Sequence, residues 1–326
     1  MSFPTRGALP ELCLRLQNEF QWSRQAARYV VKHSWDSRTA RFFLCQDADQ
    51  REPAFVVKCL PDGAGDLARR SFRSLELLAE LAATADEWVA TPPQALGWCS
   101  DPPAVAMENV TGRLGGRVLR DSLAADFGYE TLERLLRVCG ATLGRWHTSW
   151  GTDPSPSHQA TYYQQLRRTA HRQGLRLPSS PDRSASLPVV RRYRDFAIYN
   201  VLLTLDERVV ILDPPPEAAE HDLAYRDLAW FLTTLDRRVA GLVAERGDTT
   251  WEGLARFRAM RPVLARSFVL GYERGSGKQL LASDLRLVSV IEGSYLLSRM
   301  VRSLRRGELK RAACYLRLSR DARART

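Results

Sequence analysis

The sequence predicts an α+β chain in two parts, a first part with a small sheet and a longer second part built mainly of helices. Runs rich in Val, Phe and Tyr, separated by turn-forming residues, fill much of the first hundred positions. Beyond Asn109, apolar residues recur mainly at helical spacing. We therefore place a first lobe over residues 1–109 and a second lobe over residues 110–326.

The first lobe is predicted to hold an antiparallel sheet and one long helix. After a short opening helix over residues 10–20, the helix over Leu67–Ala83 is indicated by apolar residues at 67, 72, 75, 78 and 81. The loop before it carries two glycines. The expected strands are Ala27–His33, Thr39–Gln46, Pro53–Leu60, Gln94–Cys99 and Ala104–Glu108.

In the second lobe, helices are expected at Tyr129–Trp150 and Thr161–Gly174. The flanks of the second helix, Gly151–Gln159 and Pro178–Pro188, are rich in Ser and Pro and are predicted to be loops. Two short apolar strands, Val201–Leu205 and Val209–Leu212, surround a turn and predict a hairpin. Everything after Asp222 is predicted to be helical.

Composition excludes several classes of protein. The six cysteines occur singly and none of the five histidines lies at ligand spacing with another, so neither a zinc site nor a disulfide framework is favoured. The first residues show no basic segment followed by an apolar run, and no stretch is long and apolar enough to span a bilayer. These features predict a cytoplasmic protein.

The net charge of +11 is concentrated in the C-terminal part. Through Ala229 there are 28 basic and 28 acidic residues, whereas the last 97 residues carry 20 basic and 9 acidic ones. Such an excess is typical either of a solvated helical surface or of a part that binds anions.

The strongest functional signal is an acid, an amide and a second acid around the predicted hairpin. Asp195 is followed five residues later by Asn200, which leads into one apolar strand, and Asp213 ends the next strand. Paired strands would bring Asn200 and Asp213 together. Phosphoryl transfer needs two such oxygen ligands for Mg²⁺ and a carboxylate that accepts the proton of the substrate hydroxyl, which is the role we predict for Asp195.

These residues resemble a motif of the aminoglycoside phosphotransferase and choline kinase group, in which His-Gly-Asp, four residues and Asn are followed by Ile-Asp. The chain matches it with Asp195, Asn200 and Asp213. The resemblance implies a two-lobed, protein-kinase-like fold, ATP and Mg²⁺ as cofactors, and a small hydroxylated substrate. Four other segments resemble the group in the same order, namely Phe55–Lys58, Ala106–Gly112, Leu143–His147 and His221–Ala229.

The resemblance also assigns the nucleotide-binding residues. It implies that Lys58 contacts the nucleotide phosphates and that the backbone from Glu108 to Val110 contacts adenine. A carboxylate of the following helix would hold Lys58, and Glu76 fits the spacing better than Glu80, one turn away. The resemblance also allows an alignment in which Ser74 takes this position. Asp227 and His147 are expected to be structural, bonding the catalytic loop and packing in the core.

The chain departs from the family pattern in three places. The loop Ser34–Thr39 has no glycine, so hydroxyl groups such as that of Ser37 would have to contact the phosphates. Tyr193 and Arg194 replace the His-Gly before the predicted base. Three prolines follow Asp213 and predict a stiff metal-binding loop.

Three functions remain open at this point. The first is a kinase for a small molecule whose acceptor is neutral or anionic, such as a sugar, nucleoside or lipid headgroup, because a basic lobe repels polycations such as aminoglycosides. The second is a catalytically silent kinase-like scaffold, suggested by the glycine-free loop. The third is a binder of RNA or of a membrane surface. This function is less favoured, because a basic helix is more often plain solvated surface. It would use Arg302, Arg305, Arg306, Lys310 and Arg311.

Overall fold

A computed structural model describes most of the chain. The described residues are 11–12, 29–36, 40–47, 53–85, 88–124, 129–149, 152–153, 156–172, 174, 177, 189–193, 195–214, 221–246 and 252–325. The residues divide into two compact units. Unit 1 comprises Met1–Thr84, Thr91–Gly112 and Val210–Ala218, and unit 2 comprises Ala85–Ala90, Arg113–Val209 and Ala219–Thr326. Each unit therefore draws on segments that are distant in the sequence.

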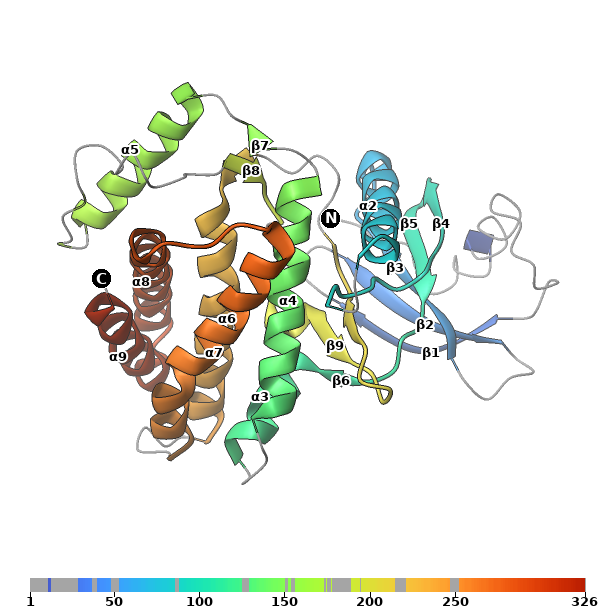
Figure 1. The fold of residues 1–326 in the computed structure, drawn as a ribbon. Coiled ribbons are helices and arrows are strands. Elements are labelled where there is room, and N and C mark those ends of the chain that lie inside the picture. The colour runs from blue at the N-terminus through green and yellow to red at the C-terminus, as the bar shows by residue number, and fades with distance from the viewer. Residues whose placement is uncertain are drawn as a thin grey trace. The chain divides into compact units, whose positions relative to one another are not determined.

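Unit 1 contains a five-stranded antiparallel sheet in the order β1-β2-β3-β5-β4 (Figure 1). Its side chains alternate between the two faces, as the pleat of a strand requires. Phe43, Phe55 and Val57 are buried on one face, whereas Phe42 and Val56 pack on the other. The strands are β1 (Tyr29–Asp36), β2 (Arg41–Asp47), β3 (Pro53–Cys59), β4 (Ala95–Ser100) and β5 (Pro103–Glu108).

Helix α2 (Gly65–Ala83) packs on this second face at β4 and β5. Its buried residues include Leu75 and Leu78, at the helical spacing that predicted it. The loop before the helix needs glycine twice. Gly63 has a positive φ of 80° in a turn, and a Cβ on Gly65 would approach the carbonyl oxygen of Ser100 to 2.9 Å. The predicted strands and helix of the sheet are thus confirmed, with ends that differ by at most three residues.

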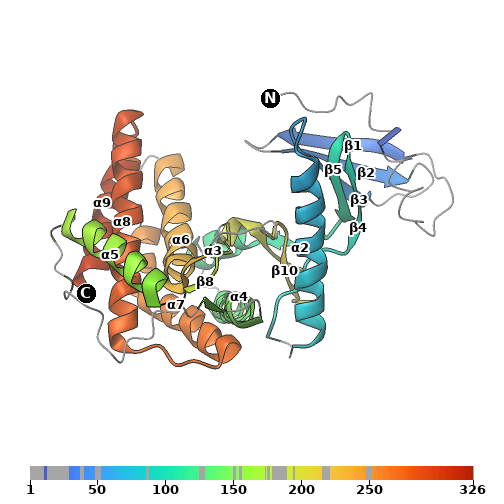
Figure 2. The ribbon, with the colours of Figure 1, turned by 90° about the horizontal axis from the view of Figure 1, so that it is seen from above.

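Unit 2 is mainly helical, as predicted. Helices α6, α8 and α9 pack against one another, and α4 packs against α7 (Figure 2). The helices are α3 (Gly115–Ala124), α4 (Glu130–Ser149), α5 (Pro156–Arg172), α6 (Ala224–Arg246), α7 (Glu252–Ser276), α8 (Ala282–Arg305) and α9 (Leu309–Ala324).

Short strands complete the fold in two three-stranded sheets of order β10-β9-β6 and β11-β8-β7. The predicted hairpin is confirmed, because Thr204 and Arg208 close the turn between its strands and Glu207 takes a positive φ of 63°. These strands are β6 (Arg113–Leu114), β7 (Thr152–Asp153), β8 (Val189–Arg191), β9 (Val201–Leu203), β10 (Val209–Ile211) and β11 (His221–Leu223).

Two sequence-based expectations for unit 2 are wrong. Residues from Pro156 onward were expected to be a loop because of their Ser and Pro content, but they begin α5, where Pro lacks only an N–H that a first turn leaves unpaired. Everything after Asp222 was expected to be helical, but Leu223 is still part of β11, which pairs with β8. The expected opening helix at 10–20 lies almost entirely outside the described residues.

Helices α4 and α7 meet through glycines. A Cβ on Gly140 would collide with the carbonyl oxygen of Phe268, and one on Gly271 would collide with that of Arg137. Gly144 and Gly275 make equally close approaches along the same contact. The two backbones therefore lie closer together than any larger residue permits at these positions.

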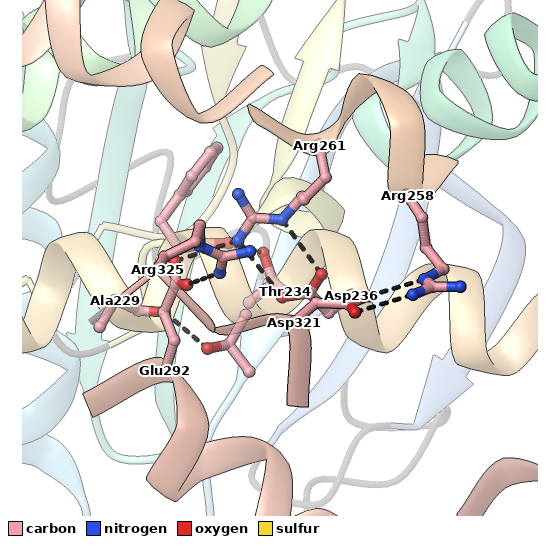
Figure 3. Close-up of polar contacts among 10 residues, drawn as sticks. Ala229, Thr234, Asp236, Arg258, Arg261, Glu292, Asp321 and Arg325 are labelled. Carbon is pink, nitrogen blue, oxygen red and sulfur yellow. Dashed lines mark hydrogen bonds and ion pairs between the residues drawn. The ribbon is translucent and has the colours of Figure 1, made fainter. Parts of the chain in front are cut away.

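A buried network of charges joins four helices of unit 2 (Figure 3). Arg261 donates to Asp236 at 3.1 and 3.3 Å and to Glu292 at 3.0 Å, and Arg325 donates to Glu292 at 2.6 Å. Two cations thus face two anions, so the buried charges are compensated. At its edge, Arg258 makes two bonds to Asp321.

Among the described residues, no helix has the length and apolar character needed to cross a membrane.

Candidate active site

In unit 1, Lys58 and Asp213 form an ion pair. Lys58 Nζ donates to Asp213 Oδ1 at 2.6 Å, with side chains that are 12% and 40% exposed. Strand β3 carries Lys58, whose Nζ lies 6.0 Å from the centre of the Phe42 ring. Asp213 follows β10, which is attached to unit 1 where Ile211 N donates to the carbonyl oxygen of Thr91. The structure therefore brings the two predicted residues into contact, although 155 residues separate them in the sequence.

The predicted partner of Lys58 is not the one that the structure shows. Glu76, with Glu80 as the alternative, was expected to hold this lysine, but both glutamates bind Arg73 of their own helix, at 3.1 and 3.3 Å. Arg73 lies three and seven residues before them, on the same side of α2, and so meets their carboxylates locally. Asp213 takes the place that Glu76 was expected to have.

The predicted adenine-binding segment begins at the end of β5. Glu108 exchanges two bonds with Gln94, through its own N–H and through its side-chain oxygen. Its backbone also pairs with Phe55 of β3. Val110, two residues beyond β5, is half-buried and lies in no strand. Ser37 and Arg194 lie outside the described residues.

In unit 2, Asp195 and Asn200 belong to one tightly bonded loop. Asn200 Nδ2 donates to the carbonyl oxygen of Asp195 at 3.0 Å and lies 3.5 Å from Asp195 Oδ2. The hydroxyl of Tyr199 donates to Asp195 Oδ1 at 3.0 Å. Ile198 N donates to Thr234 on α6, which fixes the short 3-10 turn before β9. The carboxylate of Asp195 is held in this way and remains exposed.

Asp227, in the first turn of α6, anchors the chain just before this loop. Its carboxylate accepts bonds from Tyr193 N at 2.6 Å, Arg192 Nε at 3.2 Å and His147 Nε2 at 3.3 Å. Burial raises the pKa of Asp227, but these donors outweigh it and hold the pKa below its usual range. As expected, Asp227 and His147 bond the loop and lie in the core.

Aromatic rings pack beneath the same loop. Five rings form a row in which successive ring centres lie 4.4 to 5.0 Å apart, in the order Trp146, Tyr193, Phe196, Phe231 and Phe268. All five are almost completely buried. Since Tyr193 and Phe196 flank Asp195 in the sequence, this packing limits how far the loop can move.

Arginines and aromatic rings surround the side of the loop that carries Tyr199, a feature that the sequence analysis missed. The Arg237 guanidinium lies 5.5 Å from the Tyr199 ring and 5.3 Å from the Trp230 ring, and Arg299 lies 5.9 Å from the Trp230 ring. Burial, followed by the neighbouring Asp195, raises the pKa of Tyr199. The available signal was the net charge after Ala229, which does not indicate where the arginines converge.

The predicted metal ligands each keep an oxygen for a cation. The amide nitrogen of Asn200 is bonded to Asp195, which leaves the amide oxygen of Asn200 as the free end. Asp213 binds Lys58 through Oδ1, and its Oδ2 has no partner among the described residues. Carboxylate and amide oxygens suit a hard cation such as Mg²⁺, so the donor chemistry fits.

Solved structures that resemble this chain include small-molecule kinases, although no family model and no curated protein matches it. A glucosamine kinase in complex with glucosamine, ADP and inorganic phosphate is 15% identical, with a TM-score of 0.59 over 98% of this chain and 83% of that one. A choline kinase from Cryptosporidium parvum is 12% identical, with a TM-score of 0.50 over 98% and 95%.

A GDP complex of an aminoglycoside 2'-phosphotransferase is 13% identical, with a TM-score of 0.50 over 96% and 97% of the two chains. At such low identities the likeness is one of fold. It confirms the predicted kinase-like fold with a small antiparallel sheet and a helical second part. In fold, the chain is therefore similar to the aminoglycoside phosphotransferase and choline kinase group.

Proposed function

We propose that this chain is an ATP-dependent phosphotransferase that transfers the γ-phosphate to a hydroxyl group of a small molecule. The observation that carries the proposal is the loop in which Asp195 is exposed and held by Tyr199 and Asn200. This loop occurs in a chain whose fold is shared by kinases of glucosamine, choline and aminoglycosides. The chemistry of the held side chains matches what phosphoryl transfer requires.

Each residue has a role in this proposal. Asp195 accepts the proton of the acceptor hydroxyl, and its bonds to Tyr199 and Asn200 keep the carboxylate in one orientation. Lys58 binds the nucleotide phosphates, and the backbone from Glu108 to Val110 binds adenine. Asn200 and Asp213 would hold Mg²⁺, which supplies positive charge to the phosphates when bound. Glu76, which pairs with Arg73, is given no role in this proposal.

The acceptor is proposed to be neutral or anionic. All of the net charge of +11 lies after Ala229, within α6 to α9 and the segments between them. A positive field lowers the energy of an approaching anion and raises that of a polycation. A hydroxylated sugar, nucleoside or lipid headgroup meets this requirement, and nucleic acid is not required as a partner.

Thermal unfolding with nucleotide tests the proposal. Mg-ATP should raise the melting temperature, since a ligand at about 100 times its Kd stabilises the native state by about 2.7 kcal/mol. Asp213→Asn should remove the Mg²⁺-dependent part of this shift. Asp195→Asn should keep the shift and lower turnover about 100-fold or more, the usual contribution of a positioned base.

Asp206→Asn serves as the matched control, because Asp206 is exposed in the hairpin turn, where it bonds Arg208. Its nucleotide shift and turnover should equal those of the wild type. If neither Mg-ATP nor Mg-GTP moves the wild-type transition, the proposal fails and the chain is a kinase-like scaffold. Equal loss of nucleotide binding in Asp195→Asn and Asp213→Asn would contradict the roles assigned to these two residues.

A further inference from the structure

Two arginines of unit 2 lie against Trp230, and a third follows one helical turn later. Arg237 of α6 and Arg299 of α8 both lie against the Trp230 ring, at 5.3 and 5.9 Å. Arg302 lies one turn after Arg299. Besides burial, the positive charges of Arg237 and Arg302 both lower the pKa of Arg299. Helices α6 and α8 pack against each other, so the convergence follows from the way the second unit is folded.

In the part of the chain that the structure describes, these arginines lack the carboxylates that compensate other arginines of the same unit. Arg261 is bonded to Asp236 and Glu292, and Arg258 is bonded to Asp321. By contrast, within the described part of the chain no carboxylate forms an ion pair with Arg237, Arg299 or Arg302. Burial, together with the charges of Arg237 and Arg302, lowers the pKa of Arg299. Like charges held together in this way attract an anion.

Two buried donors at the same place have no acceptor among the residues that the structure describes. Arg237 Nη1 and Trp230 Nε1 are both shielded from solvent and without a hydrogen-bond partner in the described part of the chain. A buried donor without an acceptor is costly, and native proteins leave few of them. An oxyanion that enters between these side chains would satisfy both donors.

Tyr199 connects this cluster to the predicted base. Its ring lies 5.5 Å from the Arg237 guanidinium, and its hydroxyl donates to Asp195 Oδ1 at 3.0 Å. We infer that Arg237 and Arg299, together with Trp230, form a subsite beside Asp195 that binds an oxyanion, phosphate or carboxylate, carried by the acceptor molecule. The inference rests on the proposed function and narrows its acceptor from neutral or anionic to anionic.

The chemistry of guanidinium groups suits this role. Each presents several N–H donors in a plane, which matches two oxygens of a phosphate or carboxylate. The Trp230 ring lies against both guanidinium groups and limits their freedom, so less entropy is lost when an anion binds. The subsite would hold one end of the acceptor while another end presents its hydroxyl to Asp195.

Calorimetric titration tests the subsite with inorganic phosphate and glucose 6-phosphate as probes and glucose as the neutral comparison. Arg237→Gln and Arg299→Gln should each raise the Kd of both anions about 10-fold or more, the usual effect of losing a charge-assisted bond. Arg237→Lys, which keeps the charge, should bind more tightly than Arg237→Gln. Arg286→Gln is the control, because Arg286 is exposed on the same helix about 20 Å before Arg299.

The nucleotide shift separates this inference from the proposed function. Arg237→Gln and Arg299→Gln should keep the Mg-ATP melting shift of the wild type. Equal anion affinity in the wild type and both Gln variants would overturn the subsite, as would loss of the Mg-ATP shift in these variants, which would assign the arginines to the nucleotide. If the wild type binds no nucleotide but binds phosphate through Arg237, the subsite stands and the phosphotransferase proposal fails.

Discussion

Asp227 shows how one buried side chain can fix the chain just before the loop that carries Asp195. It accepts bonds from the backbone of Tyr193, from Arg192 and from His147 of α4. The role was predictable from the sequence, because Asp227 lies in a segment that resembles the family. The partner of Lys58 was not predictable, because local helix spacing indicates Glu76, whereas Asp213 reaches the lysine only through the fold.

Asp227→Asn should destabilise the fold by about 3 kcal/mol near neutral pH, because it breaks a buried pair. The pKa of this carboxyl is lower in the folded state, so its stabilisation is complete above the ordinary Asp value of about 3.9 and is lost as the pH falls through the folded pKa. The difference in unfolding free energy between wild type and variant should therefore shrink below about pH 4. Urea unfolding measured from pH 3 to 7 tests this.

A matched variant is Asp62→Asn, in the exposed loop before α2. It should change the unfolding free energy by less than about 0.5 kcal/mol. A difference for Asp227→Asn that stays constant down to pH 3 would contradict the assigned cause.

At the scale of elements, the sequence predicts structure correctly where one pattern continues over several residues. Helix α2 and the strands of the five-stranded sheet fall into this class. Helix α3 was not predicted, because it begins with two glycines, which are poor helix formers. Gly115 is nevertheless required there, because a Cβ would approach Ile198 to 2.7 Å. Strands such as β8 and β11 have three residues each, too few for an alternation to be visible.

The contact between α4 and α7 gives a prediction at this scale. Gly140→Ala should destabilise the protein by about 1 to 3 kcal/mol, the usual cost of overpacking, because its methyl group would collide with the backbone of Phe268. Gly241→Ala, on α6, is the control. Its Cβ would meet only the Glu245 side chain at 3.9 Å, so alanine should stabilise that helix by about 0.5 to 1 kcal/mol. Melting temperatures that move in the same direction would contradict the close contact.

At the scale of the whole molecule, the composition predicted where the charge lies but not how it is arranged. The excess of arginine after Ala229 is visible in the sequence. The fold distributes these arginines among different surroundings, since Arg261 is compensated by acids whereas Arg237 and Arg299 have no acidic partner within the described ranges. Because the compensating acids come from other helices, residue counting cannot separate the two groups.

Aminoglycosides of the kanamycin type should be poor acceptors, because the positive field of α6 to α9 repels polycations. Expression in a susceptible bacterium, with growth measured on an aminoglycoside panel, tests this. An anionic acceptor should also lose kcat/KM as ionic strength rises, since salt screens the attraction. Strong resistance that disappears in Asp195→Asn would contradict the charge argument but would agree with the proposal that the chain is a phosphotransferase.

The discontinuous first unit has a consequence for biosynthesis. Lys58 precedes Asp213 by 155 residues, and a ribosome adds roughly 5 to 20 residues per second. The lysine is therefore synthesised about 8 to 30 s before the carboxylate that pairs with it. During this interval the nascent sheet lacks the segment Val210–Ala218, which completes its unit. The surface that this segment contacts in the folded unit is then uncovered, and chaperones could bind it. A chain cut before this segment would have the five strands and no partner for the lysine.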